Sequence, residues 1–351
     1  MGTISEKHGL AVALVGCGAV SEHCHLPALL KNQGCHVAAL VDSNRSRVEQ
    51  LAARYRVNHA LTHYQDLYDL RVDAAIVALP NNLHAPVTID LLRRGIHVLV
   101  EKPMALTVME CDAMIKTAAE TATTLAVGLT RRFYRAGQVV RSLVQKGVLG
   151  QLLSFDFREG RVFDWPLASD FFFRKEAAGG GVLIDTGVHA LDQLLWWLGD
   201  ASSFEYCDDN FGGVEADCVV HIKLKSGVQG IVEVSRTRNL RNTAIIRGER
   251  GELEVALTND RIALRLEGVP AQVMGQATSR QQPFGTEQAR MDPIMAEHED
   301  FLESVRERRA PVVPGFEGRR SVALIEACYR DRKPLSIPWM DGTPTLVGEI
   351  V

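Results

Sequence analysis

The sequence predicts an α/β protein with a parallel, doubly wound sheet at the N-terminus and an α+β domain with a largely antiparallel open sheet after it. The first third of the chain alternates short apolar runs with segments of helical periodicity, which is typical of strands covered by helices on both faces. Beyond about residue 130, apolar and polar residues alternate between turn signals, as in antiparallel strands. The 351 residues exceed what one core usually holds, so we expect two domains, residues 1–130 and 131–351.

The elements of the first domain follow from its apolar runs. Five runs predict buried parallel strands, and a weaker one at Val57–Ala60 would complete six. Helical spacing of apolar residues predicts a helix in each of three intervening segments. The strands are Leu10–Val15, His36–Val41, Asp73–Leu79, Ile96–Val100 and Thr124–Leu129, and the helices are Val48–Tyr55, Val87–Gly95 and Met109–Glu120.

The elements of the second domain are mixed. Strands are expected at 152–158, 217–224, 230–236 and 243–248, and Gly227 is expected to join two of them as a hairpin. Helices are expected over Ala136–Gly147, Asp185–Leu198, Ile294–Arg308 and Gly318–Tyr329. The segment Pro270–Pro283, with its Gln, Ser and Gly residues, is expected to be a mobile loop.

Composition excludes several classes of function. Hydrophobic residues make up 46% of the chain, charged residues 23%, and the net charge is −4, so no nucleic-acid partner is expected. The first ten residues are polar and no apolar run reaches membrane-spanning length, which predicts a cytoplasmic protein without a membrane partner. Seven scattered cysteines without a Cys-x-x-Cys pair argue against disulfides and structural zinc, and no metal is expected.

A glycine-rich turn follows the first predicted strand, in the order Gly16-Cys17-Gly18-Ala19-Val20-Ser21. The first glycine permits a tight turn, and the second lets the backbone approach a pyrophosphate at the N-terminus of the next helix. Ser21 stands where Gly or Ala is usual, and its small side chain should still pack against the strand. The strand–turn–helix context predicts a Rossmann dinucleotide site, with a glycine turn of another α/β protein as the alternative.

Asp42 closes the second strand. A carboxylate at this position accepts hydrogen bonds from both ribose hydroxyls and repels a 2′-phosphate, which favours NAD over NADP. Arg45 and Arg47 follow it, and their positive charges are able to bind a 2′-phosphate, so NADP remains the alternative cofactor. The alternative role for Asp42 is to cap the next helix.

Two further strand ends carry candidate cofactor contacts. The fourth strand runs into Leu79-Pro80-Asn81, with His84 three residues later, and the fifth ends in Glu101-Lys102. Ligands of such sheets sit at the carboxyl ends of the strands. His84 either contacts the cofactor or has a structural role.

Four segments together resemble the glucose–fructose oxidoreductase and inositol dehydrogenase (Gfo/Idh/MocA) family, in the same order and spacing to about residue 200. They are Val15–Leu29, Ala78–Pro86, Glu101–Thr107 and Gly179–Asp192. The resemblance implies a Rossmann domain followed by a C-terminal α/β domain. It also implies a lysine, here Lys102, beside the nicotinamide and the reacting carbon, where an ammonium favours a developing alkoxide.

Asp185 and His189 complete the predicted catalytic set with Lys102. They are four residues apart and so share a helix face, and histidine is a suitable base for a hydroxyl proton near neutral pH. Asp185 is expected either to orient the imidazole or to bind a substrate hydroxyl, with a helix-surface ion pair as the alternative. Asp192 is a more distant neighbour.

Arg131 and Trp165 are the remaining candidate substrate contacts. The resemblance links an arginine at position 131 to the substrate, whereas Arg131 and Arg132 as a solvated pair at the domain boundary is the alternative. The segment from Phe163 to Arg174 is dense in aromatic residues. We expect most of its phenylalanines to fill the second core and Trp165 to line a sugar pocket.

These observations predict an NAD-dependent oxidoreductase. It would transfer a hydride between a ring secondary hydroxyl of a sugar, glycoside or cyclitol and the cofactor, with Lys102, Asp185 and His189 in its catalytic site. The alternatives are a glycosidase that retains NAD and uses transient oxidation, and a non-catalytic NAD-binding regulator. Proteins of similar architecture are commonly dimers or tetramers, so a homo-oligomer is expected.

Overall fold

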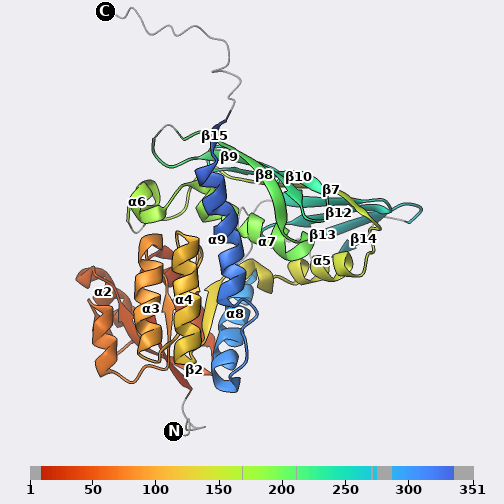
Figure 1. Cartoon of the computed structure of the whole chain (residues 1–351). Helices are drawn as coiled ribbons and strands as arrows, with labels where there is room; N and C mark the ends of the chain where they lie inside the picture. The colour runs from red at the N-terminus through yellow and green to blue at the C-terminus, as the bar shows by residue number, and fades with distance from the viewer. Residues whose placement is uncertain (1–8, 168, 211, 270–271, 275–286, 336–351) are drawn as a thin grey trace, which may run out of the picture.

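The computed structural model describes residues 9–167, 169–210, 212–269, 272–274 and 287–335. The expected loop Pro270–Pro283 lies outside these residues, except for a short strand, β14 (Gln272–Met274). In Figure 1, one parallel sheet with its helices lies below a second, larger sheet, and helix α9 (Gly315–Arg330) runs between them.

The first sheet is parallel, with the strand order β3-β2-β1-β4-β5-β6. The order reverses between β1 and β4, which is the switch point of a doubly wound fold. The runs predicted from the sequence are confirmed, including the weak one near residue 60. Their bounds are β1 Leu10–Val15, β2 Cys35–Val41, β3 His59–Leu61, β4 Ala74–Val77, β5 His97–Glu101 and β6 Leu125–Gly128.

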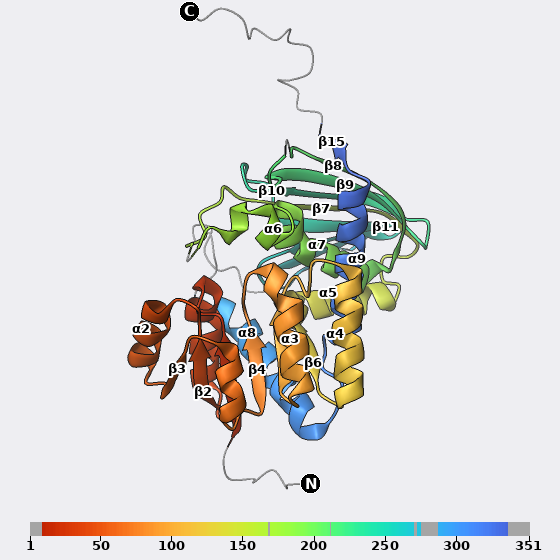
Figure 2. The ribbon, with the colours of Figure 1, turned by 60° about the vertical axis from the view of Figure 1, so that its left-hand side comes forward.

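Helices cover both faces of this sheet. On one face α3 and α4 lie side by side, as both ribbon views show (Figures 1 and 2). On the other face α1 and the late helix α8 bury Leu26, Phe301 and Leu302 against Leu14 and Leu40. The bounds of the helices are η1 Ser21–His25, α1 Leu26–Lys31, α2 Arg45–Tyr55, η2 Tyr64–Asp69, η3 Asn81–Leu83, α3 His84–Arg93, α4 Val108–Thr121 and α8 Glu287–Glu307.

The second sheet has the order β14-β13-β12-β11-β7-β10-β9-β8-β15. Most neighbours are antiparallel, but β7 pairs with β10 in parallel, so the sheet is mixed. The hairpin at Gly227 is confirmed by the antiparallel β9–β10 pair. The bounds are β7 Leu152–Gly160, β8 Ala201–Asp208, β9 Asp217–Leu224, β10 Gln229–Ser235, β11 Thr243–Gly248, β12 Gly251–Ala256, β13 Ile262–Leu266 and β15 Lys333–Pro334.

One face of the second sheet packs on helices. Phe155 and Phe157 of β7 are fully buried, and Phe157 packs on Trp197 of α7 with ring centroids 5.8 Å apart. Glu252 and Glu254 of β12 point to the opposite face, where they pair with Arg265. The remaining elements are η4 Thr130–Phe133, α5 Arg135–Gln145, η5 Phe171–Phe173, α6 Lys175–Ala178, η6 Leu183–Gly187 and α7 Val188–Leu198.

The C-terminal helices join the two halves of the molecule. α8 packs against η1, α1 and η4, and α9 contacts both α4 and α7. Figure 2 shows α8 beside the first sheet rather than with the second. The division at residues 130 and 131 therefore stays a prediction, and elements from beyond residue 280 help to cover the first sheet. None of the helices in the described ranges is long and apolar enough to cross a membrane.

Candidate active site

A cleft of about 1350 Å³ lies at the carboxyl ends of β1, β2, β4 and β5 and is closed from the other side by residues of the second half of the chain. It exceeds the roughly 300–1,000 Å³ of an ordinary small-ligand pocket, so a dinucleotide and a further small molecule can share it. Every residue predicted to bind cofactor or substrate lines it. They are Gly16, Gly18, Ala19, Val20, Asp42, Arg47, Leu79, Pro80, Asn81, His84, Glu101, Lys102, Arg131, Trp165, Asp185 and His189.

The glycine turn has the shape that a pyrophosphate requires. Gly16 has φ +101°, and a Cβ there would overlap the carbonyl oxygen of Ala78. A Cβ at Gly18 would meet no atom within 4 Å, so this glycine keeps open the space that an anion would enter. Ser21 is fully buried, and its hydroxyl donates to the carbonyl oxygen of Gly16 at 2.6 Å. The turn therefore fits the cofactor that the sequence predicts.

Asp42 is held in place by backbone amides. Its Oδ2 accepts from Cys17 N and its Oδ1 from Asn44 N, both at 2.8 Å. Asn44, and not Asp42, caps α2, because its side chain accepts from Arg47 N at 3.1 Å. The Arg47 guanidinium is bound to Glu22 at 2.5 Å. Asp42 therefore faces the cleft as an oriented carboxylate, while Arg47 is held by Glu22, which it shares with Arg54.

His84 contacts the backbone that follows β4 and the backbone that follows β5. Its Nδ1 lies 2.7 Å from Pro103 O and its Nε2 lies 2.9 Å from Leu79 O, and the side chain is almost fully buried. Asn81 Nδ2 donates to Ala178 O at 2.8 Å, which joins the first half of the chain to the end of α6. Both residues line the cleft and fix its walls.

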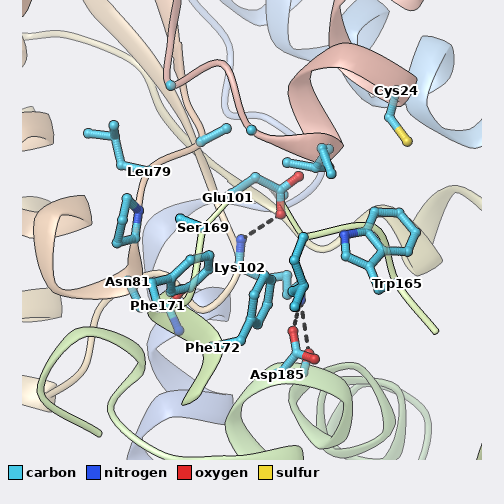
Figure 3. Close-up of a pocket in the computed structure, with 18 of the residues that line it drawn as sticks. Cys24, Leu79, Asn81, Glu101, Lys102, Trp165, Ser169, Phe171, Phe172 and Asp185 are labelled. Carbon is cyan, nitrogen blue, oxygen red and sulfur yellow. Dashed lines mark hydrogen bonds and ion pairs between the residues drawn. The ribbon is translucent and has the colours of Figure 1, made fainter. Parts of the chain in front are cut away.

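Lys102, Asp185 and Arg236 form a cluster in the cleft. Lys102 Nζ donates to the backbone oxygen of Asp185 at 2.9 Å and to its Oδ1 at 3.0 Å, while Arg236 donates to Oδ2 at 2.9 Å. Figure 3 shows the Lys102–Asp185 contacts at the centre of the pocket. Burial alone would raise the pKa of Asp185, but the charges of Lys102 and Arg236 lower it to about 2. Asp185 is thus an ionised carboxylate between two cations.

The Lys102 ammonium has three N–H groups, and Asp185 accepts from it twice. One N–H therefore remains for an oxygen atom in the cleft. Asp185 makes no hydrogen bond to His189 among the described residues, so the predicted alternative in which it orients the imidazole is not the arrangement seen.

His189 stands beside this cluster as a neutral imidazole. Burial lowers its pKa well below the usual value, and the charges of Arg131 and Lys102 lower it further. Its Nδ1 is enclosed without a hydrogen-bond partner in the described part of the chain. Nε2 is then the ring nitrogen left to meet a ligand in the cleft, and a neutral ring can accept a proton there.

The two adjacent arginines are buried rather than solvated. Arg131 makes a bidentate pair with Glu159 at 2.7 and 2.5 Å and lines the cleft. Arg132 pairs with Asp192 and Glu317 and is only 2% exposed. Asp192 is therefore engaged behind the cleft. The solvated-pair alternative is wrong, since both arginines contribute buried ion pairs.

The expectation that most phenylalanines of the segment from Phe163 to Arg174 fill the second core is also wrong. Phe163, Phe171 and Phe172 line the cleft outside the buried core, and Phe173 is 52% exposed. The reason is that η5 lies over the mouth of the cleft and not beneath the second sheet. In Figure 3, Phe171 and Phe172 lie on one side of Lys102 and Trp165 on the other.

Two features of the site were not predicted. Arg236 follows β10 directly, and a strand-end arginine gives no local sign that it meets an aspartate 51 positions earlier. The second is a buried chain in which His25 joins His298 to Glu101, with both contacts at 2.9 Å. Glu101 in turn accepts from Lys102 N at 3.0 Å. His25 lies 76 positions before Glu101 and 273 before His298, so local spacing gives no sign of this chain.

Comparisons with known proteins identify the family of the two domains that enclose this cleft. Residues 10–129 match the family described as "Oxidoreductase family, NAD-binding Rossmann fold", and residues 138–254 match the "GFO/IDH/MocA C-terminal domain". The chain is 33% identical over 191 residues to D-glucoside 3-dehydrogenase of Escherichia coli (strain K12), which is 54% of either protein. The alignment thus spans about half the length of that relative.

Two longer matches cover nearly the whole chain. The protein is 24% identical over 333 residues to myo-inositol 2-dehydrogenase of Thermotoga maritima, 90% of this chain and 94% of that one. The crystal structure of aldose-aldose oxidoreductase from Caulobacter crescentus complexed with glycerol is similar with a TM-score of 0.80 at 25% identity. That match covers 92% of this chain and 97% of the other.

The fold, the glycine turn and these matches define an oxidoreductase that binds NAD or NADP in a Rossmann domain. The chain belongs to the Gfo/Idh/MocA family, whose two domain patterns it matches in order. This membership favours hydride transfer over the alternatives of a glycosidase and a non-catalytic regulator.

Proposed function

We propose that the protein is an NAD-dependent dehydrogenase that oxidises a ring secondary hydroxyl of a sugar, glycoside or cyclitol. The observation that carries the proposal is the meeting of Lys102, Asp185 and neutral His189 in one cleft with the glycine turn and Asp42. A protein that only bound the cofactor would need none of these three side chains.

His189, Lys102 and Asp185 each have a separate role in removing a hydroxyl proton from the substrate. His189 Nε2 accepts the proton, because the ring is neutral. The remaining N–H of Lys102 donates to the substrate oxygen as its negative charge develops, which stabilises the alkoxide. Asp185 fixes the ammonium and the Arg236 guanidinium. NAD, when bound, supplies the hydride acceptor.

The residues that would hold the cofactor lie along the first sheet. Gly16 forms the tight turn, Gly18 would leave room for the pyrophosphate, and Asp42 would accept from the ribose hydroxyls. Because Asp42 is an anion and Arg47 is already paired with Glu22, we propose that NAD is preferred over NADP.

The test is the NADH absorbance that the purified protein produces with NAD against a panel. The panel holds free sugars, methyl and phenyl glycosides, inositols, sugar phosphates and simple secondary alcohols. We expect activity with polyhydroxylated rings, and activity lower by about two to four decades with Lys102→Ala. Activity confined to simple alcohols or sugar phosphates would overturn the substrate class.

We also propose that the protein is a homodimer or homotetramer, built through the outer face of the second sheet. This face carries the partly exposed Ile231 and Ile245 among ion pairs such as Arg247–Glu252 and Arg158–Glu233. Covering it with a second copy would remove this apolar surface from water. Light scattering that shows a monomer at micromolar concentration would contradict the proposal.

A further inference from the structure

One wall of the cleft is largely apolar. It is formed by side chains that line the cleft between β7 and α6, and we call it the apolar wall: Val162, Phe163, Trp165, Leu167, Phe171 and Phe172. Val162 is 56% and Leu167 46% exposed, so large apolar groups face open space here. Surface of this kind marks a place where an apolar ligand binds.

The rings of the apolar wall are arranged at angles to one another. Phe171 and Phe172 have centroids 4.0 Å apart, and Phe163 lies 6.3 Å from Phe172 at an interplanar angle of 58°. Phe172 and Trp165 flank the Lys102–Asp185 pair (Figure 3). A flat apolar group beside the reacting ring would meet both faces and edges of these rings, which is the favoured geometry for aromatic contacts.

The charges of the cleft do not suit an anionic substrate. Among the described residues, each lysine and arginine that lines the cleft is bound to a carboxylate. The pairs are Arg47–Glu22, Lys102–Asp185, Arg131–Glu159, Arg161–Asp164, Arg174–Asp170 and Arg236–Asp185. Asp185 is shared between Lys102 and Arg236, and Glu101 lies beside Lys102 in the same cleft. A phosphate or diphosphate on the substrate would find no bidentate arginine ready to bind it.

We propose that the natural substrate is a neutral glycoside with an aromatic aglycone, whose sugar ring meets Lys102 and His189 while its aglycone rests on the apolar wall. This inference rests on the proposed function, because it names the substrate of the same site. The carboxylates beside the wall, Asp164 and Asp170, already pair with Arg161 and Arg174, so they are less available to a second sugar than the rings are to an aglycone.

The test compares the phenyl and methyl glycosides of the sugar on which the panel shows activity. We expect kcat/KM for the phenyl glycoside to be about tenfold higher, carried mainly by a lower KM, because ring contacts contribute on that scale. Phe172→Ala should reduce the ratio of phenyl to methyl kcat/KM to about one. Phe316→Ala is the matched control, because this ring is 58% exposed on α9 and does not line the cleft.

A second measurement does not depend on turnover. With NADH in place of NAD, saturation-transfer NMR should show magnetisation passing from the protein to the phenyl protons, and Phe172→Ala should reduce it strongly. Equal kcat/KM for the two glycosides, a preference for a disaccharide or nucleotide sugar, or a panel in which only cyclitols and free sugars react would overturn the inference while the proposed function stands. A panel that yields no NADH at all would instead overturn the proposed function itself.

Discussion

The two sheets meet at the cleft but contribute to it in different ways. The parallel sheet supplies backbone: the turn at Gly16, the ends of β4 and β5, and amides that hold Asp42. The mixed sheet and its helices supply side chains: Asp185, His189, Arg236 and the apolar wall. In the proposed function, the first region binds the cofactor and the second carries most of the proton chemistry. Lys102, at the end of β5, is the side chain of the first region that takes part in both.

The largest expected effect follows from removing that chemistry. Lys102→Ala and His189→Ala should each lower kcat by about two to four decades, the range for a positioned proton acceptor or alkoxide donor. The Kd for NAD should change little, because the glycine turn and Asp42 are untouched. Steady-state kinetics and cofactor titration measure both, with Lys116→Ala on the exposed side of α4 as the control. Near-normal turnover in either variant contradicts the assignment.

Asp42→Ser tests the contribution of the parallel sheet to cofactor selectivity. The change removes the carboxylate that faces the ribose, and hydrogen bonds to a charged group contribute about 1.5–3 kcal/mol each. We expect the NAD-over-NADP affinity ratio to fall about tenfold or more, while kcat with saturating NAD stays near that of the wild type. Titration of both cofactors measures the ratio. A wild-type protein that prefers NADP would show that the role of Asp42 is misassigned.

Two glycines of one turn should behave differently. Gly16→Ala places a side chain at φ +101° against Ala78, so the cofactor-free protein should lose about 2 kcal/mol or more of unfolding free energy. Gly18→Ala meets no neighbour and should leave that stability nearly unchanged but weaken NAD binding. Urea unfolding and cofactor titration separate the two effects. Equal destabilisation by both variants would refute this description of the turn.

The smallest expected effect is in the pH profile. Burial and the charges of Arg131 and Lys102 lower the pKa of His189 well below 6.5, so the ring stays neutral, and able to accept a proton, as the pH falls through that value. We expect kcat/KM to vary by no more than about twofold between about pH 8 and about pH 6.5 on account of this group. An acid limb centred near 6.5 that His189→Ala abolishes would show an ordinary histidine instead.

The lowered pKa of His189 also determines how the unfolding free energy changes with pH. The unfolded chain binds a proton at His189 near the usual value, whereas the folded protein binds it only at lower pH. Unfolding free energy should therefore fall as the pH drops below about 6.5.

The sequence predicted the two regions unequally, and for a physical reason. The central strands of the parallel sheet are buried on both faces, so they appear as apolar runs such as Leu10–Val15. In the mixed sheet, the sequence missed β8, β12, β13, β14 and β15. In two of these the reason is visible, because β12 alternates glutamates with Leu253 and Val255 and β8 carries serines and a glutamate. Half-buried strands of this kind give a weaker pattern.

The residues of the site were also predictable to different degrees. The positions of Gly16, Asp42 and Lys102 could be predicted because they depend on local spacing at strand ends. The Arg131–Glu159 and Asp185–Arg236 pairs join residues 28 and 51 positions apart, and the wall formed by η5 depends on where a loop folds. Such contacts are set by the tertiary fold, and local sequence carries no sign of them.

The proposed hydride transfer is tested most directly by tracing the hydride with deuterium. A sugar or glycoside carrying deuterium at its ring carbons is incubated with the protein and NAD, and both products are examined by NMR. The account predicts a ketone at one ring carbon and deuterium on the nicotinamide of the recovered NADH. Deuterium that stays in the sugar or passes to water, with the glycosidic bond cleaved and NAD unreduced, would contradict it.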